Sequence, residues 1–404
     1  LDVPMRLGPR LRLRLGLLAL LGASLWPWFA VAAQPVPPPV LPKLTDPVGE
    51  SSPAPTRPRA SIRRRVGVWL TNSPSPLYYD GGRLDRAVAE LAAAGFNTLY
   101  PNVWSRGSTF YRSGFAPMEP ALAQANPRLD PICRLATAAH RRGMQVIPWF
   151  EYGLMEPADA QVVQQHPDWL LQQRDGTTVM TMHGRPMVWL NPAHVGVRRR
   201  FIGLVSEIVR RCGLDGIQLD DHFAWPVAYG YDPTTRELYR RESGQDPPDD
   251  YTNRVWMRWR RQQLTSLLRE LRQALPRPTV ISLSPGPFRS AYNLWLQDWE
   301  LWALGELIDD LVVQNYAYSL AGFARDLEQP ALVKAKGWGM PVEIGLLAGF
   351  GGRTTPMDQL TQQARLSFER GHGVIYFYWE GLWGQYAGPE GAAARQAAFA
   401  NLHR

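Results

Sequence analysis

From residue 66 onward, short apolar strand-like segments alternate with helical segments, and this alternation constrains the fold more than any other feature. Eight strand–helix units occupy about 340 residues, which suits a (β/α)8 barrel with insertions. Strict alternation predicts a parallel sheet with helices outside it. A doubly wound open sheet is the alternative, but no GxGxxG motif follows any predicted strand. The α/β class and a TIM barrel are therefore expected.

The element boundaries follow from apolar periodicity and from glycine and proline positions. A long excursion is expected between residues 152 and 191, before the helix that leads into the fourth strand. The predicted strands are 66–70, 97–103, 144–150, 213–221, 279–283, 311–316, 341–347 and 374–379. The predicted helices are 84–94, 131–142, 195–212, 251–275, 294–304, 323–336, 357–370 and 391–402.

The fourth predicted strand ends in two adjacent carboxylates, Asp220 and Asp221. Side chains alternate across a strand, so Gly216, Gln218 and Asp220 share one face. This small, polar face suits a barrel interior, which places Asp220 at the rim where such barrels hold catalytic groups. Asp221 has the opposite orientation and is expected to contact a neighbouring loop or His222, unless a bulge at the strand end exchanges the two.

Two further acids, Glu151 and Glu380, directly follow the third and eighth predicted strands, so they are expected on the same rim as Asp220. Glycoside hydrolysis uses one protonated and one ionised carboxyl group, and the aromatic residues that flank both Glu side chains would raise a carboxyl pKa by desolvation. Adjacent strands lie about 4.8 Å apart, close to the carboxyl separation of about 5–5.5 Å in retaining enzymes. Glu151 is therefore the expected acid partner of Asp220, and Glu380 is expected to bind substrate.

Other polar and aromatic residues near strand ends could hold sugar hydroxyls or stack on sugar rings. Asn191 precedes a helix, and its ordinary role would be to cap that helix. The candidate substrate-binding residues are Asp221, His222, Asn102, Trp104, Trp149, Asn191, Gln314, Asn315, Tyr316 and Trp379.

Neither a metal nor another cofactor is expected. His183, His194 and His222 lack the HxxxH or HExxH spacing of a histidine-based metal site. Cys133 and Cys212 form no metal or redox motif and are expected to be small buried apolar residues. The net charge of +8 is concentrated in Arg clusters without a nucleic-acid motif, so nucleic-acid binding is not expected.

The N-terminal residues are typical of an exported protein. Arg-rich residues precede the apolar run Leu15–Leu25 and a small-residue cleavage site, which predicts a signal peptide at 1–33. A proline-rich linker is expected at 34–62 and the barrel at 63–404. The apolar run is a poor permanent membrane span. We therefore expect a secreted or periplasmic monomer with no membrane span after signal cleavage.

Several segments together resemble the glycosyl hydrolase-like 10 family, in the form found in secreted cyanobacterial proteins. The resemblance implies a TIM-barrel hydrolase that acts on a polysaccharide, and relatives include enzymes that cut peptidoglycan glycan strands after the stem peptides have been removed. A metal-dependent polysaccharide deacetylase and a non-catalytic glycan-binding barrel are the alternatives. The matching segments are Gly67–Asn72, Gly95–Trp104, Val146–Gly153, His166–Trp169, Trp189–Pro192, Asp215–His222 and Leu296–Trp299.

Overall fold

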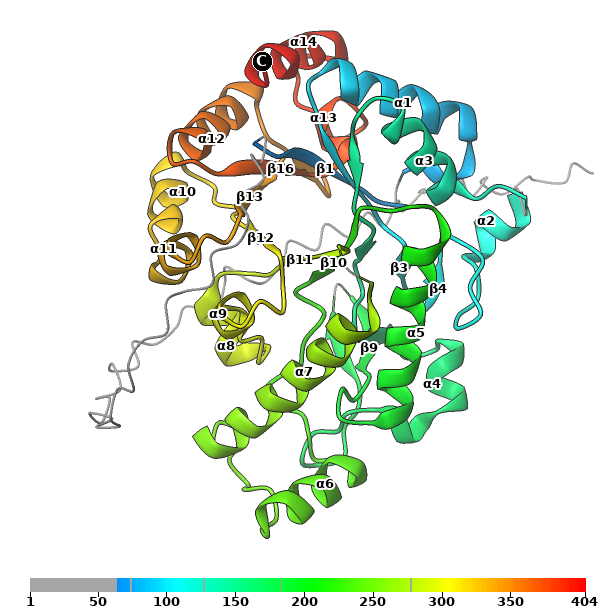
Figure 1. The fold of residues 1–404 in the computed structure, drawn as a ribbon, viewed down its shortest axis with the longest axis vertical. Coiled ribbons are helices and arrows are strands. Elements are labelled where there is room, and N and C mark those ends of the chain that lie inside the picture. Colours follow the sequence, from blue (N-terminus) through cyan, green and yellow to red (C-terminus); the bar gives the residue numbers. More distant parts are fainter. Residues whose placement is uncertain (1–63, 73–74, 126–127, 183, 277) are drawn as a thin grey trace, which may run out of the picture.

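The computed structural model describes residues 64–404, except 73–74, 126–127, 183 and 277. The expected signal peptide and linker therefore lie outside the described residues. Parallel strands form one sheet in the order β5-β2-β1-β16-β13-β12-β11-β10-β6. The two end strands of this order, β5 (Gln145–Val146) and β6 (Trp149–Phe150), are consecutive pieces of one strand. The sheet therefore closes on itself as an eight-stranded barrel, and helices surround it (Figure 1).

The interruption between β5 and β6 has a local cause. Pro148 has no backbone N–H and cannot donate to a neighbouring strand. Its carbonyl oxygen still accepts the Gln218 N–H at 2.7 Å, and the Ile147 N–H donates to the Leu99 carbonyl oxygen at 2.9 Å. The third strand therefore stays hydrogen-bonded to the second strand through Ile147 and to the fourth strand through Pro148.

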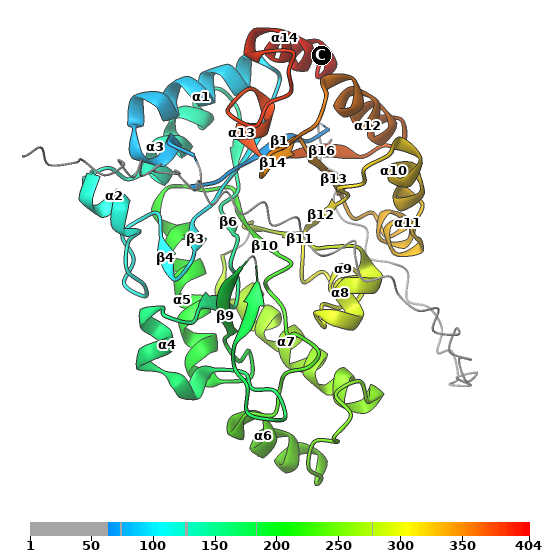
Figure 2. The ribbon, with the colours of Figure 1, turned by 180° about the vertical axis from the view of Figure 1, so that it is seen from behind.

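The (β/α)8 prediction is confirmed, and Figure 2 shows the same barrel from behind. The remaining barrel strands are β1 (Val66–Leu70), β2 (Thr98–Pro101), β10 (Gly216–Asp220), β11 (Val280–Ser284), β12 (Asp310–Gln314), β13 (Val342–Leu347) and β16 (Gly373–Phe377). The main outer helices are α1 (Gly81–Ala93), α3 (Pro131–His140), α5 (Val195–Arg211), α7 (Arg254–Ala274), α9 (Trp299–Leu304), α11 (Pro330–Gly337), α12 (Met357–Glu369) and α14 (Ala392–Leu402).

Three predicted elements differ from the structure. The predicted helix at 294–304 begins later in the structure: α8 (Phe288–Leu294) ends where it was expected to start, Leu296 adopts a left-handed backbone with φ of 53°, and α9 begins at Trp299. The predicted helix at 323–336 is divided into α10 (Leu320–Leu327) and α11, which begins at Pro330 because proline is favoured at the first helical position. The eighth strand ends at Phe377, and Glu380 lies in the short helix α13 (Trp379–Leu382) instead of at a strand end.

The expected excursion after the third strand contains its own small sheet, in which β7 (Met155–Pro157) and β8 (Met180–Met182) flank β9 (Arg185–Trp189). Further insertions lie on the same, carboxyl-terminal side of the strands, since each follows a barrel strand in the chain. They are the hairpin of β3 (Trp104–Ser105) and β4 (Ser108–Thr109), α2 (Pro120–Ala125), α4 (Gln161–Gln165), the 3-10 turn Pro167–Trp169, α6 (Pro233–Ser243) and the hairpin of β14 (Gly349–Phe350) and β15 (Arg353–Thr354).

The core has two layers, which confirm the predicted orientation of the fourth strand. Ile217 and Leu219 belong to the large cluster between strands and helices. Gln218 points the other way, where its side chain accepts the Trp69 Nε1–H at 2.6 Å and donates to Ser282 Oγ at 3.0 Å. Trp69 belongs to a second cluster that fills the barrel interior: Trp69, Tyr100, Ile147, Trp149, Val312, Ile375 and Tyr378.

The two cysteines form a disulfide, so the prediction of two unpaired buried residues is wrong. Cys133 in α3 and Cys212 at the end of α5 have Cα atoms 5.1 Å apart, within the usual range for such a bond. They are 79 residues apart in the chain, and only the packing of α3 near the end of α5 brings them together. Within the described part of the chain, no helix is long and apolar enough to cross a membrane.

A buried charge cluster lies at the opposite, amino-terminal end of the strands. Arg65 Nη1 lies 2.6 Å from Asp310 Oδ2 and 3.7 Å from Glu343 Oε1. Burial raises the pKa of Glu343 to about 8, although the Arg65 charge opposes this shift. The folded protein therefore binds a proton that an unfolded glutamic acid, with its pKa near 4.3, releases. This linkage stabilises the fold at low pH and is lost as the pH rises towards about 8.

We expect Glu343→Gln to remove this pH dependence, since the amide keeps the shape of the protonated acid. Its thermal midpoint should exceed that of the wild type by roughly 2–4 °C at pH 9 and approach it at pH 5. Calorimetry between these pH values measures both differences. A parallel decline of the two midpoints with pH would show that Glu343 is not the group responsible.

Candidate active site

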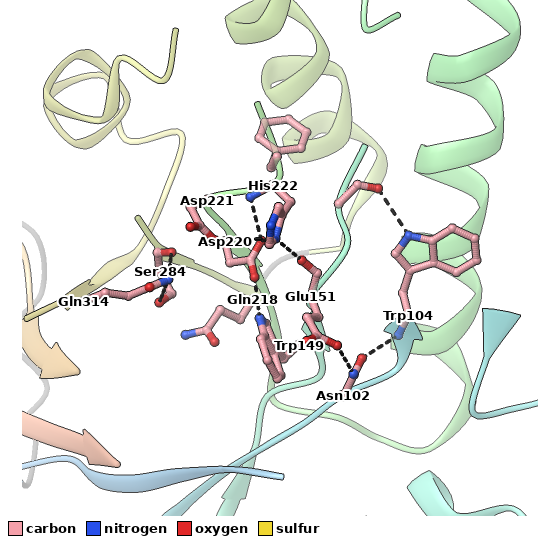
Figure 3. A network of polar contacts seen from close by, with 12 residues as sticks. Asn102, Trp104, Trp149, Glu151, Gln218, Asp220, Asp221, His222, Ser284 and Gln314 are labelled. Atoms are coloured by element: carbon pink, nitrogen blue, oxygen red, sulfur yellow. Dashed lines mark hydrogen bonds and ion pairs between the residues drawn. The ribbon is translucent and has the colours of Figure 1, made fainter. Parts of the chain in front are cut away.

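The carboxyl ends of the second, third and fourth strands bring the main candidate residues together (Figure 3). Asn102 follows β2 and pairs with Trp149 of β6, and Glu151 follows β6 directly. In the parallel register, Leu219 of β10 lies opposite Phe150, which places Asp220 at the same level as Glu151. The predicted rim therefore exists at these three strands.

Asp220 is 2% exposed and points into the barrel. Its Oδ2 accepts the Trp149 Nε1–H at 3.0 Å, and its Oδ1 accepts the backbone N–H of His222 at 2.9 Å. Burial raises the pKa of Asp220 to about 7, against the opposing effect of the nearby His222 charge. A carboxyl group with a pKa near neutrality can give and take a proton at physiological pH.

His222 joins the ends of the third and fourth strands. Its Nδ1 lies 2.7 Å from the backbone oxygen of Glu151 and 3.5 Å from both Asp220 Oδ1 and Asp221 Oδ1. Burial alone would lower the pKa of His222, but the Asp221 and Asp220 charges raise it to about 10. The imidazole is therefore cationic at neutral pH, and its Nδ1–H donates to the Glu151 carbonyl.

Glu151 is partly exposed, and Figure 3 shows it between Asn102 and His222. Its Oε2 accepts from Asn102 Nδ2 at 2.5 Å, and Asn102 Oδ1 in turn accepts the backbone N–H of Trp104 at 3.1 Å. Burial raises the pKa of Glu151, while the positive charge of Arg106 opposes this shift. The structure thus places Glu151 beside Asp220, as expected, whereas its chemical role stays a prediction.

Glu380 occupies a different place. Its Oε2 accepts the backbone N–H of Gln385 at 3.3 Å, and its Oε1 has no hydrogen-bond partner among the described residues. Burial raises the pKa of Glu380, and Ser75 is the side chain that most opposes the shift. No hydrogen bond or ion pair between described residues joins Glu380 to Asp220 or Glu151. Glu380 thus lies in α13 instead of at a strand end. Burial raises the pKa of the Tyr378 phenol, and the charges of both Glu380 and Glu151 add to this shift, so the substrate-binding role of Glu380 stays a prediction.

Three candidate substrate-binding residues are buried in structural roles. Trp104 is 1% exposed and its Nε1 donates to the Gly153 carbonyl at 3.2 Å, so its ring has no free face. Asn191 is fully buried and its Nδ2 donates to Asp232 Oδ1 and Thr235 Oγ1, both at 2.9 Å. Asn315 is 6% exposed and its Nδ2 donates to the Phe323 carbonyl at 3.1 Å. These bonds give the three side chains a structural role inside the protein, and their binding of substrate stays a prediction.

Asn191 also does not cap the helix that follows it. The residue that caps α5 is His194, whose Nδ1 accepts the Gly196 N–H at 3.1 Å. Asn191 Oδ1 accepts from the Ala193 N–H at 2.8 Å and so closes the turn before the cap.

Of the remaining candidates, Gln314 and Tyr316 lie near the acid cluster. Gln314 is partly exposed, and its Nε2 donates to the Ser284 carbonyl at 3.2 Å. Burial raises the pKa of Tyr316, and the Asp221 and Asp220 charges add to the shift, which places the phenol near both acids. Trp379 packs against the outer hydrophobic cluster from α13.

Three residues at the site were not predicted from the sequence. Arg106, in the β3–β4 turn with φ of 52°, donates from Nε to Tyr152 Oη at 3.3 Å. The Tyr152 ring lies over His222, with ring centroids 6.0 Å apart and planes at 24°. Gln297 Nε2 donates to the carbonyl oxygens of Asp220 and Phe223 at 2.8 and 2.9 Å, which fixes the turn after β10. Their roles depend on contacts between distant segments, for which the sequence carries no local signal.

A metal ion could use one ligand atom each from Asp220, Asp221 and His222, because these atoms lie within 4.8 Å of one another. His222 Nδ1 lies 2.7 Å from the Glu151 carbonyl oxygen, so Nε2 is the ring nitrogen left to bind an ion. A second group of Asp130, Cys133 and Cys212 has the same spacing, but its sulfur atoms are joined in the disulfide.

Comparison with known proteins gives one family and several relatives. The model of the family described as Glycosyl hydrolase-like 10 matches residues 63–367. Glycosyl hydrolase DigH of Escherichia coli (strain K12) is 24% identical over 271 residues, which cover 60% of this chain and 57% of the relative. The chain thus spans little more than half the length of this relative. DigH of Escherichia coli O6:H1 is 24% identical over 317 residues, covering 68% of this chain and 70% of the relative.

Two solved structures share the fold. The glycoside hydrolase domain of PgaB (BpsB) from Bordetella bronchiseptica superposes with a TM-score of 0.63 at 14% identity, covering 78% of this chain and 94% of that domain. Alpha-L-fucosidase isoenzyme 2 from Paenibacillus thiaminolyticus has a TM-score of 0.60 at 17% identity, covering 84% of this chain and 49% of that protein. At such low identities the likeness concerns the barrel alone.

Proposed function

Because the chain belongs to the glycosyl hydrolase-like 10 family, we propose that it is a glycoside hydrolase that cleaves a cell-wall or extracellular polysaccharide. Peptidoglycan glycan strands are the substrate proposed first. The observation that carries the proposal is the pairing of Asp220 and Glu151 at adjacent strand ends, with the cationic His222 joining them. Relatives named glycosyl hydrolase and a neighbour named glycoside hydrolase support the same reaction class.

The electrostatics favour Asp220 as the acid and Glu151 as the nucleophile, which reverses the roles expected from the sequence. Burial brings the pKa of Asp220 to about 7, so this carboxyl group keeps its proton in slightly acidic solution. Burial raises the pKa of Glu151 as well, but the positive charge of Arg106 and the hydrogen bond from Asn102 oppose this shift and favour the ionised form. Glycoside hydrolysis needs one protonated and one ionised carboxyl group.

The proposed reaction has two steps with retention of configuration. In the first, a Glu151 oxygen attacks the anomeric carbon, the glycosidic C–O bond breaks, and Asp220 gives its proton to the leaving oxygen. In the second, the Asp220 carboxylate takes a proton from water, the water oxygen attacks the same carbon, and the bond to Glu151 breaks. The positive charge of His222 stabilises the Asp220 carboxylate between the two steps.

The purified protein should release glycan fragments from peptidoglycan sacculi that have been treated with an amidase to remove stem peptides, and mass spectrometry would identify them. The Asp220→Asn protein is the control for contaminating activity. A mass loss of one acetyl group per sugar that disappears with a chelator would instead indicate a metal-dependent deacetylase. Binding to sacculi without any product would indicate a non-catalytic glycan-binding barrel.

We also propose that the protein is secreted or periplasmic, because the Cys133–Cys212 disulfide suits an oxidising compartment. Fractionation of expressing cells, with thiol labelling of the recovered protein, tests this. Recovery of the mature protein from the cytoplasm with two free thiols would contradict it.

A further inference from the structure

A concave surface lies away from the acid cluster, between residues 113–117, α4 and α5. Its volume of about 360 Å³ is in the range of small-ligand pockets. None of Asp220, Glu151 and His222 lines it. Trp104 lies between the two sites, because the Arg200 guanidinium packs 5.1 Å from its ring and its Nε1 contacts Gly153, beside His222. The residues used below to argue for this site are Phe115, Gln161, Gln165, His166, Trp169 and Arg200.

Two glycines of α5 let aromatic rings lie directly on the helix backbone. A Cβ atom at Gly203 would lie 2.4 Å from Phe115 Cε1, and one at Gly196 would lie 2.5 Å from Trp169 Cζ2. Positions seven residues apart share one helix face and are separated by about 10.5 Å, roughly the length of a disaccharide. The Phe115 and Trp169 rings therefore lie one after the other along the same side of α5.

The ring faces turned away from α5 are those of Phe115 and of His166, which stacks on Trp169. Phe115 is 43% exposed, so the ring face turned away from Gly203 is open to solvent. The other face of Trp169 carries His166, with ring centroids 3.9 Å apart and planes at 9°. Flat apolar faces of this kind suit the C–H faces of sugar rings, which bury well against aromatic groups.

Polar groups between the rings complete the site. Arg200 lies between the two glycines on the same helix, and its Nε donates to the Phe115 carbonyl at 3.2 Å. Its Nη1 also lies 3.4 Å from Oε1 of the buried Glu156. Burial raises the pKa of Glu156 to about 7, against the opposing Arg200 charge, so in slightly acidic solution this partner is largely neutral and the guanidinium favours a carboxylate ligand. The exposed amides of Gln161 and Gln165 line the same cavity from α4 and can exchange hydrogen bonds with hydroxyl and acetamido groups.

We propose that this surface is a second glycan-binding site, which holds a carboxylate-bearing segment of the polysaccharide while another segment occupies the acid cluster. The choice of a glycan as ligand rests on the proposed function. The site would keep the enzyme on a polymer without taking part in bond cleavage.

The test measures binding of peptide-free peptidoglycan glycan strands to the Asp220→Asn protein, so that no substrate is consumed. A second change in this protein, Phe115→Ala, should weaken its binding of the strands by about tenfold relative to Asp220→Asn alone. Adding Gly203→Ala should weaken it similarly by displacing the Phe115 ring, although alanine favours the helix. Tyr251→Ala removes an aromatic side chain of similar exposure, 45%, at a distant turn and should change nothing. The neutral hexamer of N-acetylglucosamine should bind more weakly than the acidic strands.

Binding of the strands by the Phe115 and Gly203 variants as tight as that of the Tyr251 variant would refute the site. Equal affinity for the neutral hexamer would refute the carboxylate preference assigned to Arg200. These readouts do not depend on turnover, so they separate this inference from the proposed function. A wild-type protein that forms no product but loses binding with Phe115→Ala would contradict the hydrolase and support the site.

Discussion

Asp220→Asn should lower turnover of a glycan by roughly a thousandfold and leave the thermal midpoint within about 2 °C of the wild type. The asparagine keeps the acceptor oxygen for one of the two N–H donors, Trp149 Nε1 and the His222 backbone, that now bind the carboxylate. It has no proton to give to the leaving oxygen. The loss should therefore fall almost entirely on the chemical step.

Substrates with different leaving groups can show whether Asp220→Asn has lost only its proton donor or has a damaged site. An aryl glycoside whose phenol leaves without protonation should be cleaved by Asp220→Asn with a loss of less than about tenfold in the first step, since acid catalysis contributes little there. For the wild type acting on a glycan, kcat/KM should fall as the pH rises through about 7, where Asp220 loses its proton. The variant acting on the aryl glycoside should lack this decline.

Asp221→Asn is the matched control, because it changes the adjacent carboxylate, which lies at the same 3.5 Å from His222 Nδ1. Its effect should not depend on the leaving group. If Asp221→Asn showed that dependence and Asp220→Asn did not, the acid would be Asp221 and the orientation argument for Asp220 would be wrong.

The barrel could be predicted from the sequence because its determinants are local. Apolar periodicity and glycine boundaries define each strand and helix within about ten residues, and alternation then allows few topologies. The inward orientation of Gln218 and Asp220 followed from the two-residue period of a strand. The same reasoning placed Glu151 beside Asp220, since neighbouring units of the chain form neighbouring strands.

The sequence did not reveal contacts that no local pattern connects. Asn191 donates to Asp232 and Thr235, 41 and 44 residues away, and Asn315 donates to the carbonyl of Phe323, 8 residues away. The disulfide depends on the packing of α3 near the end of α5. Predicting any of these contacts requires the tertiary structure, because the residues between the partners carry no periodic signal.

The position of Glu380 was missed for a different reason. The apolar and aromatic residues after β16 continue the pattern of a strand, but the chain leaves the sheet at Phe377 and starts α13 two residues later. A strand ends where its backbone loses a pairing partner, and β13, the neighbour of β16, ends its pairing at Leu347 opposite Phe377. Aromatic composition alone therefore overestimates the length of the last strand.

Glu151→Gln should lower turnover of both the glycan and the activated aryl glycoside by roughly a thousandfold or more. An amide in place of the carboxylate cannot attack the anomeric carbon, whatever the leaving group. The change should be well tolerated by the fold, because the amide oxygen can still accept from Asn102 Nδ2, now at 2.5 Å. Loss with both substrates is the signature that distinguishes Glu151 from Asp220.

The wild type provides an independent test of the same role. Because burial raises the pKa of Glu151, kcat/KM should rise as the pH increases through a value above that of an ordinary glutamic acid, where the nucleophile ionises. The first product should retain the anomeric configuration of the substrate, as observed by NMR during the first turnovers. Rapid acid quench followed by peptide mass spectrometry should find the glycosyl group on the peptide that carries Glu151. Inversion of configuration, with no such adduct, would make Glu151 a base that activates water and would exclude the covalent step.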